Sequence, residues 1–419
     1  MSTLAPRLRF KEFESTFFSK VTLGNVTDYF KGFAFKSVDY TYVGVKNNRI
    51  IRVSDLISDS IKNNNSMIFY PEIKDDNVDK YRIKYEDIIV TTVGSRPELK
   101  ESAVGRGIYI TSQHNGFLNQ NLLVLRSKKS NVSKFIAAQI NTNRYIEYIK
   151  SIQRGNANQA NITVADLLKY TVFVSTTSEQ QKIADFLTSV DTKISLLTEK
   201  HRLLKDYKKG VMQQIFSQKI RFKDDDGKAF PDWKEKLLGD IATFTKGKSI
   251  SKADISIDGM TPCIRYGELY TTYAEVIESV VSATNLPIGG LLLSKANDVI
   301  VPSSGETQWD IATAACVKLS DVAYSGDLTV IRTSLNGVFL SYYFNSAKKR
   351  EIASLSQGSS VIHLYSTHLK SLKIEIPCKA EQQKIAQFLQ SLDKKINAVN
   401  EQIEQTKLFK KGLLQQMFV

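Results

Sequence analysis

Residues Glu179–Phe216 read EQQKIADFLTSVDTKISLLTEKHRLLKDYKKGVMQQIF, and residues Glu381–Phe418 read EQQKIAQFLQSLDKKINAVNEQIEQTKLFKKGLLQQMF. Aligned at a constant offset of 202 residues, 20 of these 38 pairs are identical. Both copies have the composition of a long helix, and each follows a larger segment of different sequence. An internal repeat constrains the architecture more than any single residue does. We therefore expect two similar halves, each a globular unit followed by a long helix.

Apolar residues follow a three-then-four spacing along both copies, which is the heptad pattern of a coiled coil. His201, Thr406 and the equivalent residues Lys208 and Lys410 interrupt this seam, and such interruptions commonly fix register or let helices splay. At 1.5 Å per residue, each helix would be roughly 57 Å long. Neither copy can bury its seam alone, so we predict that the two pack antiparallel. The predicted helix-pair and subunit interface consists of Ile183, Leu187, Val190, Ile194, Leu197, Leu204, Ile385, Leu389, Leu392, Ile396, Val399 and Ile403.

The segments that precede the two helices resemble each other more weakly. The corresponding stretches are Leu23–Val26 with Leu238–Ile241, Asp87–Val90 with Asp298–Val301, Leu122–Arg126 with Leu328–Arg332, and Phe135–Asn143 with Phe339–Ser346. The last pair is predicted to be helical, whereas the two pairs before it have the apolar character of buried strands. Each unit therefore mixes short strands with few helices, which indicates an α+β fold.

The predicted fold class is α+β, with two globular units in a pseudo-two-fold arrangement joined by two long antiparallel coiled-coil helices. We predict the first unit at residues 1–178, the central helix at 179–216, the second unit at 217–380 and the C-terminal helix at 381–419. Residues 217–237 contain an acidic run, a glycine and a proline, and are predicted to form an exposed leader of the second unit.

Length and composition narrow the class of protein. A chain of 419 residues suits two or three domains, and 42% hydrophobic residues can form real cores. No apolar stretch approaches the length of a membrane span, and the N-terminal sequence lacks the apolar segment of a secretory signal. The three cysteines, Cys263, Cys316 and Cys378, are too widely spaced for a disulfide framework. We therefore expect a cytoplasmic protein with no membrane association.

The common catalytic signatures are missing from the sequence. The eight prolines include no Pro-Pro pair, which excludes the Asn/Asp-Pro-Pro-Tyr/Phe signature of amino-group methyltransferases. Gly247-Lys248-Ser249 lacks the upstream glycine of a phosphate-binding loop, because residue 242 is alanine. None of the four histidines has an obvious Ser or Cys partner or good metal-ligand spacing. We therefore predict that this chain alone is not an enzyme and binds no metal or cofactor.

The charge is unevenly distributed and favours a polyanionic partner. The formal net charge is +14, with 25 Lys and Arg against 16 Asp and Glu in residues 1–178. Residues 217–380 carry 19 basic against 18 acidic residues. A basic chain attracts nucleic acid. A lysine-rich protein without such a partner is the alternative, and the near-neutral second half argues against purely electrostatic binding.

Two polar, glycine-containing segments recur at matched positions in the two halves, as sequence-specific DNA reading would require. The alternative interpretation of each is an ordinary polar surface turn. The candidate DNA-binding residues in these segments are Ser95, Arg96, Arg154, Asn156, Asn158, Gln159, Ser303, Ser304, Gln308, Gln357, Ser359 and Ser360. Weaker candidates, which are more often solvated surface cations, are Lys36, Arg52, Arg106, Lys246, Lys248 and Arg265.

The chain resembles the specificity subunits of type I restriction-modification systems over nearly its whole length. The residues that carry the resemblance are the twin Glu-Gln-Gln-Lys-Ile-Ala segments at 179–184 and 381–386, and the twin Lys-Lys-Gly-x-x-Gln-Gln-x-Phe endings at 208–216 and 410–418. The family often has Ile-Pro-Pro before Glu-Gln-Gln, whereas Ile376-Pro377-Cys378 keeps one of these prolines. This departure affects only the corner between strand and helix.

The resemblance implies a function and a set of partners. In this family, two target recognition domains each read one half of a bipartite, asymmetric site in double-stranded DNA, and the paired helices act as a ruler for the unread gap. The resemblance also implies two methylation subunits, which carry S-adenosylmethionine, and two restriction subunits, which use ATP and Mg. No cofactor is expected on this chain itself.

Two other classes of function remain open from the sequence. The chain could be the recognition subunit of another class of modification enzyme, with a similar layout and different partners. It could also be a coiled-coil scaffold whose globular units bind proteins. The basic first half and the polar glycine loops disfavour this scaffold.

Overall fold

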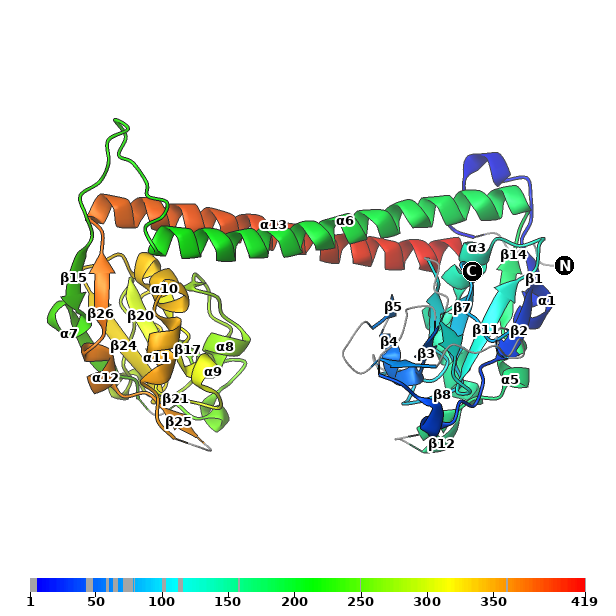
Figure 1. Cartoon of the computed structure of the whole chain (residues 1–419), viewed down its shortest axis with the longest axis horizontal. Helices are drawn as coiled ribbons and strands as arrows, with labels where there is room; N and C mark the ends of the chain where they lie inside the picture. The colour runs from blue at the N-terminus through cyan, green and yellow to red at the C-terminus, as the bar shows by residue number, and fades with distance from the viewer. Residues whose placement is uncertain are drawn as a thin grey trace. The chain divides into compact units, whose positions relative to one another are not determined.

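The computed structural model describes residues 6–42, 48–57, 60–62, 67–70, 78, 80–99, 103–111, 116–156, 159–248, 250–358 and 361–418. The chain divides into two compact units (Figure 1). Unit 1 consists of Met1–Leu196 together with Gln402–Val419, and unit 2 is Leu197–Glu401. The domain boundaries predicted from the sequence place each long helix in a separate segment. In the structure, each compact unit instead includes part of both long helices. Both units combine short strands with few helices, which confirms the α+β class.

Unit 1 is built on a four-stranded sheet in the order β2-β11-β7-β9, with every neighbouring pair antiparallel. The apolar run at the start of β11 is fully buried, as expected of a central strand. The strands are β1 (Ser19–Thr22), β2 (Thr27–Lys31), β3 (Arg49–Ile51), β4 (Leu56–Ile57), β5 (Ser60–Ile61), β6 (Ile68–Phe69), β7 (Ile88–Thr91), β8 (Val93–Gly94), β9 (Gly107–Tyr109), β10 (Phe117–Leu118), β11 (Leu122–Ser127), β12 (Arg154–Asn156), β13 (Gln159–Asn161) and β14 (Thr171–Val174). The helices before the long helix are η1 (Lys11–Phe13), α1 (Leu23–Val26), η2 (Ser37–Asp39), η4 (Val53–Asp55), α3 (Ser133–Gln139), α4 (Asn143–Ile152) and α5 (Val164–Leu168).

Unit 2 repeats this plan with the sheet order β16-β24-β20-β22-β18. Its strands are β15 (Lys234–Leu237), β16 (Ala242–Lys246), β17 (Thr261–Ile264), β18 (Val276–Ile277), β19 (Ser282–Thr284), β20 (Asp298–Pro302), β21 (Ser304–Gly305), β22 (Ala315–Val317), β23 (Ala323–Tyr324), β24 (Leu328–Thr333), β25 (Ile362–His363) and β26 (Lys373–Ile376). Its shorter helices are α7 (Leu238–Ile241), η5 (Lys252–Asp254), α8 (Glu268–Thr271), η6 (Ile288–Gly290), α9 (Gln308–Ile311), α10 (Gly337–Ser346), α11 (Lys349–Ser354) and α12 (Ser366–Lys370).

The correspondence between the units extends to buried ion pairs. Arg126 on β11 donates to Asp87, which precedes β7, at 2.8 and 2.9 Å. Arg332 on β24 donates to Asp298 at the start of β20, at 2.9 and 3.1 Å. Both carboxylates are almost completely buried, so each needs its guanidinium partner.

One predicted helix is wrong in its extent. Residues 135–143 were expected to form a single helix, but α3 ends at Gln139 and α4 begins at Asn143. Asn141 adopts a left-handed conformation with φ of 70°, which ends α3, and the Thr142 side chain caps α4 by accepting a hydrogen bond from the Tyr145 amide.

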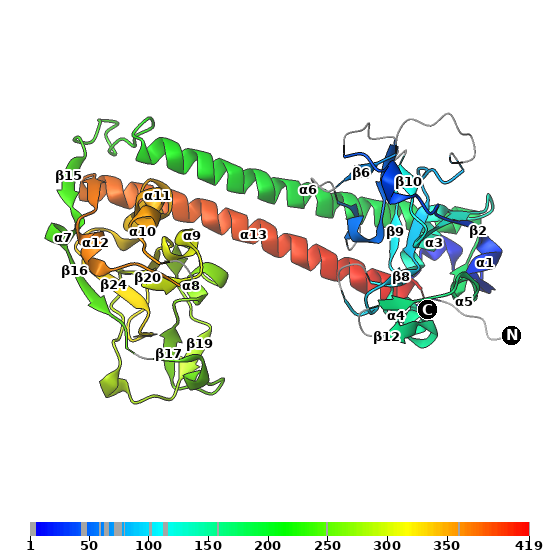
Figure 2. The same ribbon diagram turned by 60° about the horizontal axis from the view of Figure 1, so that its bottom comes forward.

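The two long helices pair antiparallel inside each unit. Helix α6 spans Thr177–Phe216 and α13 spans Lys379–Met417, against predicted ranges of 179–216 and 381–419. Figures 1 and 2 show the two helices side by side. In unit 1 the start of α6 packs with the end of α13, and in unit 2 the end of α6 packs with the start of α13. Of the twelve predicted interface residues, Ile194, Leu197 and Leu204 are half-buried and the other nine are buried.

Reciprocal ion pairs interrupt the apolar seam at equivalent positions. In unit 1, Lys410 of α13 lies 2.5 Å from Asp191 of α6, and in unit 2, Lys208 of α6 lies 2.7 Å from Asp393 of α13. Burial acts to raise the pKa of Asp191, but hydrogen bonds from Lys134 and Lys410 outweigh it and hold this pKa below its usual value. The lysines that break the heptad pattern are therefore paired in the structure.

The first turn of each long helix carries a buried glutamate that binds an arginine of the leader, the segment that precedes the first strand of each unit (residues 6–18 and 217–233). Arg9 donates to both carboxylate oxygens of Glu179, at 2.6 and 2.7 Å. Arg221 donates to Glu381 at 3.1 and 2.7 Å, and the Trp233 Nε1 donates to the same carboxylate at 3.1 Å. These hydrogen bonds raise the pKa of both arginines above the ordinary value. The leaders are thus fastened to the starts of the helices.

Candidate nucleic-acid interface

Small sheets bring the matched polar segments of each unit together. In unit 1, β12 and β13 form a hairpin, and β13 also pairs with β8. In unit 2, β21 pairs with β25, and Gln357 bridges to His363. The name tip sheet 1 is used for the sheet of β12, β13 and β8. The name tip sheet 2 is used for the β21-β25 pair together with the Gln357 bridge. The two segments predicted separately in each half therefore form one surface.

Backbone hydrogen bonds show which positions of the two tip sheets correspond. The Thr92 amide donates to the Asn121 carbonyl at 2.9 Å, as the Ser303 amide donates to that of Asp327 at 2.8 Å. The Ile162 amide donates to the Thr92 carbonyl at 3.0 Å, and the Leu364 amide donates to the Ser303 carbonyl at the same distance. Thr92 thus corresponds to Ser303, and Ile162 to Leu364.

Glycine is required at one position of each tip sheet. Gly155 has φ of 104° and Gly358 has φ of 126°, values that favour glycine over any residue with a Cβ. A Cβ on Gly155 would lie 2.3 Å from the Gln159 carbonyl oxygen, and one on Gly358 would lie 2.1 Å from that of Val361. At both glycines the backbone therefore approaches a neighbouring strand more closely than a residue with a Cβ would allow.

Replacing Gly155 with alanine is expected to distort tip sheet 1 and leave the helices intact. The left-handed φ and the clash with Gln159 would strain the hairpin by about 1–3 kcal/mol, so we expect DNA binding to fall at least tenfold. Gly210→Ala is the matched control, because a Cβ there meets no atom within 4 Å. It should stabilise α6 by about 1 kcal/mol. Undiminished DNA binding by Gly155→Ala would show that the hairpin is not part of the interface.

Tip sheet 1 presents several of the predicted residues. Arg96 is exposed, Arg154 keeps 65% of its side chain exposed, Gln159 is exposed, and Ser95 is half-buried. A hollow of about 230 Å³ next to the hairpin is lined by Arg96, Glu98, Lys150, Gln153 and Gly155. Asn158 and the Asn156 side chain lie outside the described residues.

Tip sheet 2 presents fewer of the predicted residues. Gln308 and Gln357 are exposed. Ser303 and Ser304 are buried, and the Ser303 hydroxyl shares a hydrogen bond of 2.8 Å with that of Thr329. Burial disfavours a direct base contact by either serine. Ser359 and Ser360 lie outside the described residues.

The weaker candidates lie apart from the strands of the tip sheets. Arg52 and Arg265 occupy equivalent positions and form equivalent ion pairs, with Asp55 and Glu268 respectively, each at 3.2 Å. This favours a structural role for both arginines. Arg106 donates to the Leu99 carbonyl at 2.9 Å. The side chains of Lys36, Lys246 and Lys248 are exposed.

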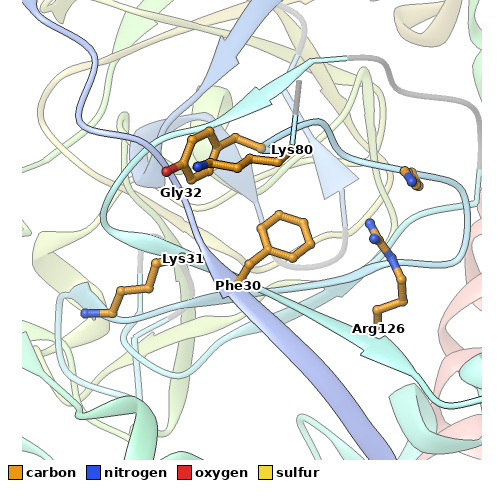
Figure 3. A pocket seen from close by; sticks show the side chains of 7 residues that line it. Phe30, Lys31, Gly32, Lys80 and Arg126 are labelled. Atoms are coloured by element: carbon orange, nitrogen blue, oxygen red, sulfur yellow. The ribbon is translucent and has the colours of Figure 1, made fainter. Parts of the chain in front are cut away.

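Unit 1 also contains a cationic hollow that was not predicted from the sequence. This hollow of about 600 Å³ is lined by Phe30, Lys31, Gly32, Lys80, Tyr81, Lys84 and Arg126. Figure 3 shows the Phe30 ring with Lys80 on one side and Arg126 on the other. The Arg126 guanidinium lies 5.1 Å from the centre of that ring, and the Lys80 ammonium lies 5.2 Å from the centre of the Tyr81 ring. Its cations come from three distant segments, so no local pattern in the sequence marks it.

Some kinds of site are absent from the described part of the chain. None of its helices is long and apolar enough to cross a membrane. Among the same residues, no group of three or more His, Cys, Asp or Glu side chains is arranged to hold a metal ion.

The chain thus consists of two repeated α+β units, each with a polar tip sheet and a share of two long helices. The family model of the type I restriction modification DNA specificity domain matches residues 18–206 and 231–407. The chain belongs to this family.

Relatives and solved structures agree with this assignment. The chain is 23% identical over 377 residues to a protein of Methanocaldococcus jannaschii assigned as the MjaX type I restriction enzyme specificity subunit, covering 86% of this chain and 84% of that protein. It is 26% identical over 215 residues to the MjaVIII specificity subunit of the same organism, covering 50% and 47%. The fold is similar to the crystal structure of the type I restriction-modification S subunit from M. genitalium, with a TM-score of 0.58, 15% identity and 99% of both chains covered. A chain from a structural study of the assembly of a type I restriction-modification complex has a TM-score of 0.55 at 16% identity, covering 96% of this chain and 97% of that chain.

Proposed function

We propose that this chain is the non-catalytic subunit that selects DNA sites for a type I modification and restriction complex, with each unit reading one half of a bipartite site. The observation that carries the proposal is the pair of tip sheets, built at corresponding positions from segments that differ in sequence. A shared scaffold with different surface residues is what reading two different half-sites requires. S-adenosylmethionine, ATP and Mg would then be bound by the partner subunits.

The long helices are proposed to set the number of unread base pairs between the half-sites. Helix α6 has 40 residues and α13 has 39, so each is about 60 Å long at 1.5 Å per residue. A turn of DNA is about 34 Å. Helices of this length can therefore hold two reading units at positions about one turn of DNA apart.

Adding one heptad to both helices is expected to lengthen the gap and leave the half-sites unchanged. Seven residues inserted after Lys200 and after Gln402 preserve the apolar seam and add about 10 Å, or about three base pairs of DNA. The modified sites can be mapped by long-read sequencing. The control is the same insertion in α6 alone, which shifts the seam against its partner and should abolish modification. An unchanged gap in the double insertion would contradict the ruler.

Exposed apolar residues on the paired helices are the proposed docking surfaces for two methylation subunits. Leu196, Leu203 and Tyr207 of α6 are 66%, 51% and 54% exposed, and Phe409 of α13 is 55% exposed. Tyr207 and Phe409 are equivalent in the repeat, separated by 202 residues. Exposed apolar stretches on a helix indicate a protein partner. Two equivalent surfaces would bind two copies of one subunit, to which two restriction subunits would add.

Co-expression with the cognate methylation subunit in a methylation-free host tests the whole proposal. Long-read sequencing should reveal one bipartite adenine-methylation motif with a fixed gap. A complex that co-purifies with the methylation subunit yet modifies no defined motif would favour a scaffold function. Cleavage mapping with the restriction subunits then separates a type I complex, which the family predicts, from another class of modification enzyme.

A further inference from the structure

The two tip sheets differ in charge at corresponding positions. In unit 1, residues 92–99 and 150–162 include Arg96, Lys150 and Arg154 against a single acid, Glu98. The corresponding stretches of unit 2, residues 303–310 and 352–364, contain no lysine or arginine, and they include Glu306 and Asp310. Arg154 pairs with Asp166 at 3.1 Å and Lys150 pairs with Glu147 at 2.7 Å, yet the Arg154 side chain stays 65% exposed and Arg96 is exposed. Exposed cations that can meet phosphates are therefore present at tip sheet 1, whereas these stretches of tip sheet 2 contain none.

Two exposed aromatic side chains accompany tip sheet 2. Trp309 is 54% exposed and Tyr365 is 51% exposed. Trp309 lies on α9, which packs against β21 and β25. Thr92 and Ser303 are equivalent, and Trp309 follows Ser303 by the same number of residues as Glu98 follows Thr92. Trp309 therefore occupies the position of Glu98 in unit 1. The Thr307 side chain caps α9 by accepting a hydrogen bond from the Asp310 amide at 3.1 Å, which holds the turn that carries Trp309.

The Tyr365 ring of tip sheet 2 is supported by its neighbours. The Tyr365 ring lies 5.6 Å from the His368 ring, edge to face, and 6.3 Å from the His363 ring. His368 is held in turn through its Nδ1, which is 3.0 Å from the Leu355 carbonyl oxygen. An aromatic ring that is held by its neighbours and half exposed to solvent is suited to stacking on another flat surface.

We propose that the two units hold DNA by different forces, unit 1 through ion pairs with phosphates and unit 2 through stacking of Trp309 and Tyr365 on nucleobases. This inference rests on the proposed function and assigns one kind of DNA contact to each of the two reading units. Stacking on a base requires an opened or kinked step, as apolar wedges produce in the minor groove. The half-site read by unit 2 would therefore be locally unstacked in the complex.

The rest of unit 1 supports this division. Lys31 and Lys84 of the cationic hollow have no ion-pair partner among the described residues, and Arg126 keeps 38% of its side chain exposed. Thr245 of β16 is the unit 2 equivalent of Phe30 in β2, since each directly precedes a Lys-Gly pair. Unit 2 therefore has no aromatic ring at this position. A hollow that combines the Phe30 ring with Lys31 and Lys84 can accept a sugar-phosphate group, because the lysines attract the phosphate and the ring offers apolar surface.

Salt dependence of binding separates the two forces. The assembled complex with methylation subunits is titrated with DNA carrying its mapped site, at salt concentrations from 50 to 200 mM. Each phosphate ion pair contributes about 0.9 to the slope of log affinity against log salt. The double variant R96Q/R154Q should therefore lower this slope by about two. The double variant W309A/Y365A should weaken binding at least tenfold at every salt concentration without changing the slope.

A base analogue tests the stacking directly. 2-Aminopurine is quenched by stacking, so it should brighten on binding of the wild-type complex when it stands beside the opened step of the half-site read by unit 2 and stay dark when it is itself the base stacked on the rings. W309A/Y365A should abolish the brightening. W309F/Y365F keeps both rings and should retain it. Lys20→Gln, a change of an exposed lysine on β1, is the charge control and should leave the salt slope unchanged.

Three outcomes would overturn the division of forces. One is unchanged affinity in W309A/Y365A, and another is a fall in its salt slope equal to that of R96Q/R154Q. The third is loss of methylation-subunit binding by W309A/Y365A in the absence of DNA, which would assign the two rings to a protein contact. Failure of the wild-type complex to prefer its site over scrambled DNA would instead refute the proposed function itself.

Discussion

Replacing Arg9 with alanine is expected to lower the free energy of unfolding of unit 1 by about 3–5 kcal/mol, the cost of breaking a buried ion pair. The Glu179 side chain is completely buried, and that of Arg9 is 8% exposed. Arg9 supplies two hydrogen bonds to the carboxylate, and its Nη2 also lies within hydrogen-bonding distance of the Thr16 hydroxyl. Without the guanidinium, the carboxylate keeps a long hydrogen bond of 3.4 Å from the Thr16 hydroxyl but loses its positive partner. A buried carboxylate without a positive partner costs stability.

The equivalent change in unit 2 should cost less. Arg221 is 22% exposed, and the Trp233 Nε1 still donates to Glu381 when Arg221 is removed. Segment-resolved hydrogen exchange can measure each unit separately. Arg202→Ala is the matched control, because its side chain is 58% exposed and its ion pairs lie on the surface of α6. That change should cost less than 1 kcal/mol.

Equal effects of Arg9→Ala and Arg202→Ala would contradict this account. They would mean that the Glu179 carboxylate finds another partner or water when the guanidinium is lost. Glu179→Gln distinguishes these cases, since an amide keeps the shape and part of the hydrogen bonding without the buried charge. If burial of an unpaired charge is the cause, the double variant Arg9→Ala with Glu179→Gln should recover more than half of the lost stability.

Replacing both Tyr207 and Phe409 with glutamate is expected to reduce DNA methylation by the assembled complex at least a hundredfold. A carboxylate at the centre of an apolar contact must be desolvated without a partner, and this penalty would fall on both proposed docking surfaces at once. Each single variant should lose one methylation subunit, which native mass spectrometry can count. Both residues are exposed, so the variants should fold as the parent chain does.

The control for the docking prediction lies on the opposite flank of the same helices. Lys209 and Lys411 are exposed, and their spacing from the seam places them away from Tyr207 and Phe409. Lys209→Glu with Lys411→Glu changes the charge more than the test variant does, yet should leave the subunit ratio unchanged. Retention of two methylation subunits by the Tyr207→Glu and Phe409→Glu double variant would show that another surface binds them.

The architecture was predictable because the signals that specify it are periodic and repeated. The heptad spacing and the 202-residue offset indicated two paired helices and two α+β units, and both are present. The break at Asn141 was not predicted, since a single left-handed residue inside an apolar helical pattern leaves little trace in sequence. The matching ion pairs of Arg9 with Glu179 and of Arg221 with Glu381 were not predicted, because nothing in the sequence joins these arginines to these partners.

The interface was predicted at the level of segments and less well at the level of residues. Matched glycine-containing loops identified Gly155 and Gly358, which the structure holds in conformations that need glycine. Polarity alone could not show that Ser303 points into a hydrogen bond with Thr329. The cationic hollow was invisible because Lys31, Lys84 and Arg126 converge only in three dimensions. Similarly, Trp309 stands out only once its exposure is known.

The division of the chain into units has a consequence for the order in which it folds during synthesis. Unit 2 is one uninterrupted stretch, Leu197–Glu401, whereas the core of unit 1 includes Leu413, Met417 and Phe418. Domains usually fold in the order in which the ribosome releases them. Here unit 1 cannot complete its core until the end of α13 has left the ribosome, so Ile183 and Leu187 stay exposed to solvent until then. The growing polypeptide would therefore complete the folding of unit 2 before that of unit 1. Chaperones would bind the exposed apolar residues of unit 1 during this delay.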